Sequence, residues 1–178
     1  FGAKRDGTFG EEAVFSDQHV ALNKPYYFAA AVRLASKDAP GSITFYLKDL
    51  SNDDEPLLTA KLPHGIVGGF DHKKPMTLGR RGASAGADFD GLLDDVRLSG
   101  AALGVDELLF TREGINKHTL GYWQFEPKPG AFVDGSGHGL DIRPAAAKPM
   151  TAPRDARQTA WADFCHVLLN SSEFLYVE

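Results

Sequence analysis

The sequence predicts an all-β fold, an antiparallel β-sandwich of jelly-roll type, followed by an α-helical tail. One observation is the alternation of apolar residues in "YYFAAAVRL" (26–34) and "SITFYLK" (42–48), which is typical of half-buried strands. Another is the turn-forming composition of "ASKDAPG" (35–41) and "DLSNDDEP" (49–56), which border those runs. Short strands separated by frequent turn signals are typical of antiparallel sandwiches and jelly rolls.

The alternation also predicts which side chains face the core. We expect the inward residues of the first two strands to be Phe28, Ala30, Val32, Leu34, Ile43, Phe45 and Leu47. Further strands are expected in "PLLTAKL" (56–62) and "MTLGR" (76–80). The glycine- and proline-rich stretch 63–75 between them is expected to be a loop.

A change of phase marks the next strand, "FDGLLDDVRL" (89–98). The expected inward residues are Phe89, Gly91 and Leu93 before the change, and Val96 and Leu98 after it. The slip falls on Asp94 and Asp95, where a β-bulge or an interrupted ladder would keep one face inward. One of these aspartates is then expected to accept backbone N–H bonds, to pair with Arg97, or to hold a cation.

The longer stretch "FDGLLDDVRLSGAALGVDELL" (89–109) resembles the closing motif of the laminin G-like, concanavalin A-like jelly-roll family. That motif runs Phe-x-Gly-x-Ile-Asp-Glu-Val-Arg-Ile, followed by a loop and a short acidic helical turn. The residues that match it directly are Phe89, Gly91, Asp94, Val96 and Arg97, and those that replace it conservatively are Leu93, Asp95 and Leu98. Gly104 stands where the family usually has a capping Ser or Thr.

A second stretch, "LGYWQFEPKPGAFVDGSGHGLDI" (120–142), resembles the opening strand and turn of the same family. Trp123 and Phe125 alternate as core residues there, and Asp134 begins a glycine-rich turn. We expect residues 121–126 to pair beside 91–98 and to close one sandwich over residues 1–144. The alternative is the start of a second repeat. The resemblance implies that the family's usual first half precedes Phe1, so we expect an excerpt with an exposed sheet edge.

The C-terminal residues have a different pattern. Residues 145–153 are interpreted as a linker to a tail, 154–178, where Trp161, Phe164, Cys165 and Leu168 form one apolar helical stripe. The stripe predicts a helix over about 155–169. Ala160 to Glu178 resembles the end of a domain of unknown function in large exported planctomycetal proteins that also carry a cytochrome c domain. This resemblance implies a periplasmic or extracellular location.

Composition excludes several classes of function. The net charge of −5 and the pI near 5.7 disfavour nucleic-acid binding, and no apolar run has membrane-spanning length. The single cysteine, Cys165, allows neither an internal disulfide nor a CxxCH haem attachment, and a buried structural thiol is expected. We hypothesise one cofactor, a calcium ion that Asp94, Asp134 and nearby carbonyls hold.

Catalysis is not expected. The glucanase pattern Glu-x-Asp-x-x-Glu is absent from the chain, as are phosphate-binding and nucleophile-elbow motifs. The family resemblance implies a carbohydrate- or ligand-binding module, with Tyr26, Tyr27 and Tyr46 as exposed rings that stack on a glycan. The alternative is a structural module that packs against upstream domains of its own polypeptide. A glucanase-type hydrolase is a distant third hypothesis.

Overall fold

The computed structural model has strands as its regular secondary structure, apart from one 3-10 turn, in the residues that it describes. It describes residues 2–68, 76–79, 89, 91–126, 132–143, 169–170 and 172–175. The strands of this part of the chain are β1 (Gly2–Lys4), β2 (Phe9–Gly10), β3 (Tyr26–Arg33), β4 (Gly41–Asp49), β5 (Leu58–His64), β6 (Ile66–Gly68), β7 (Leu93–Asp94), β8 (Val96–Ser99), β9 (Thr119–Trp123), β10 (Leu169–Asn170) and β11 (Ser172–Leu175). One turn of 3-10 helix, η1 (Val105–Glu107), follows Gly104 at the predicted acidic helical turn. The all-β prediction is confirmed.

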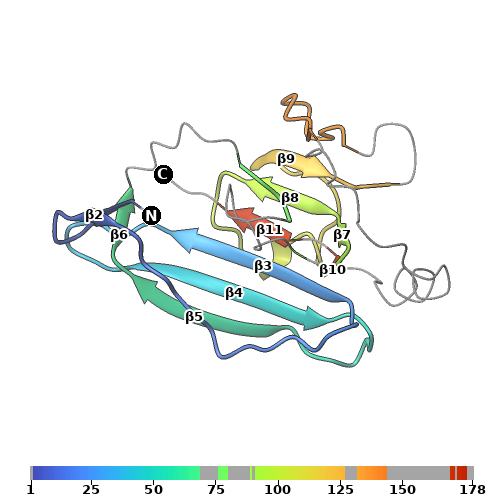
Figure 1. Ribbon diagram of the computed structural model, residues 1–178, viewed down its shortest axis with the longest axis horizontal. Helices are drawn as coiled ribbons and strands as arrows, with labels where there is room; N and C mark the ends of the chain where they lie inside the picture. Colours follow the sequence, from blue (N-terminus) through green and yellow to red (C-terminus); the bar gives the residue numbers. More distant parts are fainter. Residues whose placement is uncertain are drawn as a thin grey trace, which may run out of the picture.

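The main sheet has six strands in the order β5-β4-β3-β11-β8-β9 (Figure 1). Strands β3, β4 and β5 form an antiparallel meander, and β8 pairs antiparallel with β9. Strand β11 lies between β3 and β8 and runs parallel to both. Two smaller sheets, β2-β1-β6 and β10-β7, account for the remaining strand pairs among the described residues.

The meander follows the predicted strands and turns closely. Strands β3 and β4 pair in register over eight residue pairs, joined by the predicted turn. In the turn between β4 and β5, Asp49 Oδ1 accepts the N–H of Ser51 at 2.8 Å, and Asn52 Oδ1 accepts the N–H of Asp54 at 3.1 Å. Such local bonds are the reason that Asp and Asn favour turns. Both predicted strands and the turn after them are confirmed.

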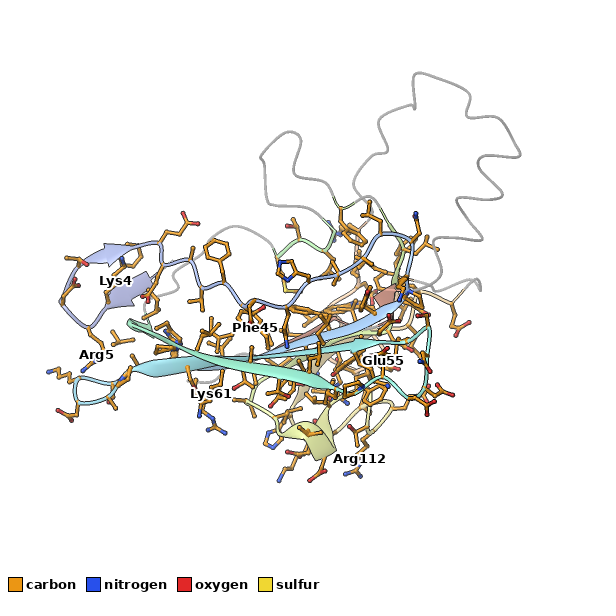
Figure 2. All side chains as sticks on the ribbon, turned by 90° about the horizontal axis from the view of Figure 1, so that it is seen from below. Lys4, Arg5, Phe45, Glu55, Lys61 and Arg112 are labelled. Carbon is orange, nitrogen blue, oxygen red and sulfur yellow. The ribbon has the colours of Figure 1, made fainter. Side chains whose placement is uncertain are left out.

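The core lies on the face of the meander that carries Tyr27 and Tyr46. Its buried residues are Tyr27, Ala29, Ala31, Tyr46, Leu103, Leu108, Leu109 and Tyr122. The loop after β8, which includes η1 and Arg112, lies on one side of the sheet, and the segment before β3 runs along the other (Figure 2). The core cluster therefore takes Tyr27, Ala29 and Ala31 from β3, the face opposite to the predicted one, although Ala30 on the predicted face is also buried and Phe28 and Val32 are half-buried. Three consecutive alanines, 29–31, left no large side chain to mark the inner face.

The strand predicted from Phe89 is shorter than expected. Phe89 and Gly91 lie outside any strand, and Phe89 is 43% exposed, so their expected inward position is wrong. The Phe89 N–H donates to the carbonyl of Gly79 at 2.8 Å, and a Cβ on Gly91 would stand 2.7 Å from the Phe89 ring. The hydrogen bond of Phe89 and the close approach of its ring to Gly91 stabilise the bend at Gly91. Residues 76–79 of the other predicted strand are also not strand, whereas β6 lies in the predicted loop.

The described part of the C-terminal tail is strand. Strand β10 pairs parallel with β7, and β11 occupies the interior of the main sheet. The predicted linker and the predicted helix, with Trp161, lie outside the described residues, apart from Leu169 at the end of that helix, which belongs to β10. No helix in the part of the chain that the structure describes is long and apolar enough to cross a membrane.

Candidate functional site

The phase change at Asp94 and Asp95 is an interruption of the ladder at one left-handed residue. Strand β7 ends at Asp94 and β8 begins at Val96, and Asp95 between them has a φ of 47°. The short polar side chain of Asp tolerates this conformation better than most side chains do. Of the two predicted forms, the structure has the interrupted ladder. A register shift occurs further on, between Leu98 and Ser99 against β9.

Strand β8 is covered on both faces, which the alternation did not predict. Val96 is buried as expected and Leu93 is half-buried, but Arg97 is also fully buried. The Arg97 guanidinium donates to the carbonyl oxygens of Gly114 at 2.7 Å, Arg112 at 3.3 Å and Glu107. Arg97 therefore fastens the loop after η1 onto β8, a structural role that differs from the predicted pairing with an aspartate.

Tyr122 of β9 holds the second aspartate. Its hydroxyl donates to Asp95 Oδ1 at 2.9 Å. Burial raises the pKa of Asp95, and the charges of Glu113 and Glu126 add to the increase, although the Tyr122 bond opposes it. Burial, followed by the charge of Asp95, raises the pKa of Asp94 in the same way. Burial, together with the bond to Asp95, also raises the pKa of Tyr122. Negative charge is therefore unfavourable at Asp94 and Asp95, between β7 and β8.

The turn after β9 holds a carboxylate in the opposite condition. Asp134 Oδ1 accepts the N–H groups of Tyr122 and Ser136, both at 2.9 Å. Asp134 Oδ2 accepts the Ser136 hydroxyl at 2.7 Å and the Leu140 N–H at 3.0 Å. Burial by itself would raise the pKa of Asp134, but these four bonds outweigh burial and lower the pKa to about 2. Asp134 therefore clamps the glycine-rich turn onto the edge of the sheet.

The two aspartates predicted to share calcium lie on different sides of β9. The Tyr122 N–H reaches Asp134, and the Tyr122 carbonyl accepts the Gly135 N–H at 2.7 Å, so the turn lies on the side of β9 away from β8. Asp94 precedes β8 on the other side. Among the described residues, no group of three or more His, Cys, Asp or Glu side chains is arranged to hold a metal ion. The contacts give the calcium hypothesis no support, and it stays a prediction.

The predicted stacking platform does not form. Tyr26, Tyr27 and Tyr46 are 7%, 1% and 6% exposed, so their expected exposure is wrong. Tyr27 packs against the Phe110 ring at 5.4 Å between centroids, and the Tyr26 hydroxyl accepts the Ala21 N–H at 3.1 Å. Tyr27 and Tyr46 are buried because the loop after β8 covers their face of the meander, whereas Tyr26 lies on the opposite face, where the segment before β3 contacts it. A tyrosine ring has a polar hydroxyl, which is compatible with exposure, but the covering segments bury these three rings.

Trp123 lies in the core, as predicted from the sequence. It is 2% exposed, and its Nε1 donates to the Leu140 carbonyl at 2.8 Å. A Cβ on Gly121 would stand 2.5 Å from the Trp123 ring, so the glycine leaves the space that the indole fills. Trp123 and Asp134 thus hold the same turn from two sides.

Other buried polar side chains also form hydrogen bonds with main-chain groups. The Lys48 ammonium donates to the carbonyl oxygens of Asp53, at 3.1 Å, and Glu55, and lies 5.6 Å from the Phe110 ring centroid. His64 Nδ1 accepts the Ile66 N–H at 3.1 Å, so Nε2 carries the proton and donates to the Arg33 carbonyl at 3.0 Å. Sequence reasoning missed Lys48, His64 and Tyr122 because their partners are main-chain groups or distant residues that no local spacing reveals.

Comparisons of the chain with protein-family models, with curated proteins and with solved structures give no match. The likeness of residues 89–109 and 120–142 to the laminin G-like family therefore rests on the quoted motifs. The geometry at those motifs is a carboxylate clamp and a buried arginine, both of which hold loops in place.

Proposed function

We propose that the chain is a non-catalytic β-sheet module of a larger exported polypeptide and that it packs against other segments of that polypeptide. In this proposal the sheet is part of a concanavalin A-like jelly-roll sandwich. The family motifs at 89–109 and 120–142 and the planctomycetal likeness of the tail support the fold and the extracytoplasmic location. The antiparallel pairing of β8 with β9 supports the expected neighbourhood of the two motifs.

The observation that carries the proposal is a set of exposed apolar side chains in β2 and in the segment between β2 and β3. Phe15 is 82% exposed and Leu22 is 89% exposed, and Phe9 and Val20 are also largely exposed. This segment runs along one side of the sheet (Figure 2). A contiguous patch of exposed apolar side chains is typical of an interaction surface, and we propose that these four side chains form one. The partner that fits them is an apolar surface, as a neighbouring domain of the same polypeptide would supply.

The rival proposal is glycan binding, which the family resemblance implies. Its predicted aromatic platform is buried, so it now rests on the resemblance alone. A glycan array tests it directly. Saturable binding to one glycan class, retained after loss of the exposed apolar side chains, would favour this rival over the interaction module.

The interaction proposal is tested by binding between this chain and the remainder of the polypeptide encoded by its gene. Replacing Phe15 and Leu22 with Ser should weaken the binding at least tenfold, because the loss of two apolar anchors exceeds about 1.4 kcal/mol. The control replaces Val105 and Ile115, which are 43% and 56% exposed, with Ser and should bind as wild type does. Equal binding by all three proteins would sink the proposal.

A further inference from the structure

The main sheet consists of two antiparallel parts joined by one strand. Strands β5, β4 and β3 form the first part, and β8 and β9 form the second. Strand β11 pairs with β3 on one side and with β8 on the other, so that residue 174 lies between Ala30 and Leu98. Strand spacing near 4.8 Å places β3 and β8 about 10 Å apart. That interval has room for one strand.

With β11 in place, both walls of the interval are buried and their main-chain groups pair with it. Ala29 on β3 and Arg97 and Ser99 on β8 have no exposed surface. Main-chain N–H and C=O groups that are buried without partners cost about 1–3 kcal/mol each. Several such groups on each wall would lack partners if β11 left, because β3 and β8 do not pair with each other.

The strand that fills the interval is short and reaches it by a long connection. Strand β11 has four residues, and residues 144–168 connect the last described residue of the Asp134 turn to β10. A connection of 25 residues reaches at most about 80 Å, at roughly 3.3 Å per residue. A parallel strand has no tight hairpin that fixes it to either neighbour. The same strand can therefore enter the interval of its own chain or that of another copy.

We propose that the interval between β3 and β8 is a strand-acceptor site that also takes β11 of a second copy of this chain, which gives a strand-exchanged dimer. The exchange is reciprocal, because each copy donates one β11 and accepts one, and it keeps every pair of the main sheet. The acceptor wall of β3 carries only alanines from 29 to 31, so recognition rests on backbone pairing. This site is independent of the exposed apolar segment between β2 and β3.

The first test is the molar mass of the full-length chain after refolding at low and at high protein concentration. We expect a dimer fraction that increases with refolding concentration and persists after dilution, measured by size-exclusion chromatography with light scattering. The variant Phe174→Pro removes one main-chain donor from the middle of β11 and should abolish that dimer. The control Val20→Pro, in the exposed segment before β3, should dimerise as wild type does. Absence of a dimer at every concentration, or equal dimerisation by Phe174→Pro, would overturn the proposal.

A second measurement keeps the test valid if Phe174→Pro folds poorly. A synthetic peptide of residues 169–178 is added to the full-length Phe174→Pro chain, and the melting temperature is followed as the peptide concentration increases. We expect a saturable increase with the wild-type peptide and none with a scrambled peptide of the same composition. Equal melting curves with both peptides would mean that the interval accepts no strand in trans.

Discussion

Two aspartates contact the same tyrosine and have opposite electrostatic conditions. Asp134 binds the Tyr122 N–H and Asp95 binds the Tyr122 hydroxyl. Asp134 accepts three N–H groups and one hydroxyl, and its pKa falls to about 2. Burial and neighbouring carboxylates raise the pKa of Asp95, although it too has a hydrogen-bond donor. The number of hydrogen-bond donors, more than burial, therefore decides whether an ionised aspartate stabilises this fold.

The two sites also contribute opposite dependences on pH. A folded-state pKa below the unfolded value of about 3.9 gives Asp134 a stabilising contribution above that value, which is lost as pH falls toward 2. A raised folded-state pKa gives Asp95 a penalty that is absent at low pH and grows as pH rises from about 3.9 through the folded-state pKa. Ionisation of Asp134 therefore stabilises the fold, whereas ionisation of Asp95 destabilises it.

The largest effect is expected from Asp134→Ala. The substitution leaves the N–H groups of Tyr122, Ser136 and Leu140 without their acceptor and should lower the free energy of unfolding by about 3 kcal/mol at pH 7. Urea denaturation measures the loss. The control Asp141→Ala removes one accepted bond, from the Asp134 N–H, and should lose about 1 kcal/mol. A smaller loss for Asp134→Ala than for Asp141→Ala would contradict the clamp.

An intermediate effect is expected from Tyr122→Phe. Loss of the hydroxyl leaves Asp95 without that donor and should lower the free energy of unfolding by about 1–2 kcal/mol. The control Tyr26→Phe loses a hydroxyl that accepts the Ala21 N–H at 3.1 Å from a segment exposed to water, and should lose less. Thermal or urea unfolding compares the two variants. If they lose equal stability, the Asp95 bond has no special weight.

A small gain is expected from Asp95→Asn. Asn keeps an acceptor for the Tyr122 hydroxyl, tolerates a φ of 47° and removes the charge that burial and Glu113 disfavour. The free energy of unfolding should rise by about 0.5 kcal/mol at pH 7, after allowance for solvent screening, and the gain should vanish near pH 3. The exposed control Asp106→Asn should give no gain. A gain that persists unchanged at pH 3 would show that charge is not its cause.

The smallest effect is expected from calcium. Both oxygens of Asp134 already accept hydrogen bonds, and Asp94 lies on the other side of β9. The melting temperature should therefore be the same with added calcium and with added chelator, in wild type and in Asp94→Asn. A calcium-dependent increase in wild type that is lost in Asp94→Asn would establish the metal site and contradict this account of Asp134.

The sequence predicted the meander because local turn chemistry and apolar alternation specify it, and it predicted the pairing of β8 with β9 only through the resemblance of the two motifs to the closing and opening strands of one family. It misplaced Tyr27 and Tyr46 because their burial depends on a loop that is distant in the chain, and it misplaced Phe89 because the strand begins only at Leu93. Arg97 was expected to pair with an aspartate, since nothing near it in the sequence reveals the three carbonyls that accept its hydrogen bonds. Periodicity also gave no sign that the chain end would form a strand inside the sheet, because β11 is set by non-local pairing.

The most direct measurement is the titration of the aspartate side chains by NMR, with the carboxyl signals followed from pH 7 to pH 2 in one sample. The account predicts a midpoint of about 2 for Asp134 and a midpoint above the ordinary value of 3.8 for Asp95. Asp95→Asn and Asp134→Asn assign the two signals. Equal midpoints near the ordinary value would contradict the claim that the two contacts of Tyr122 hold carboxylates in opposite conditions.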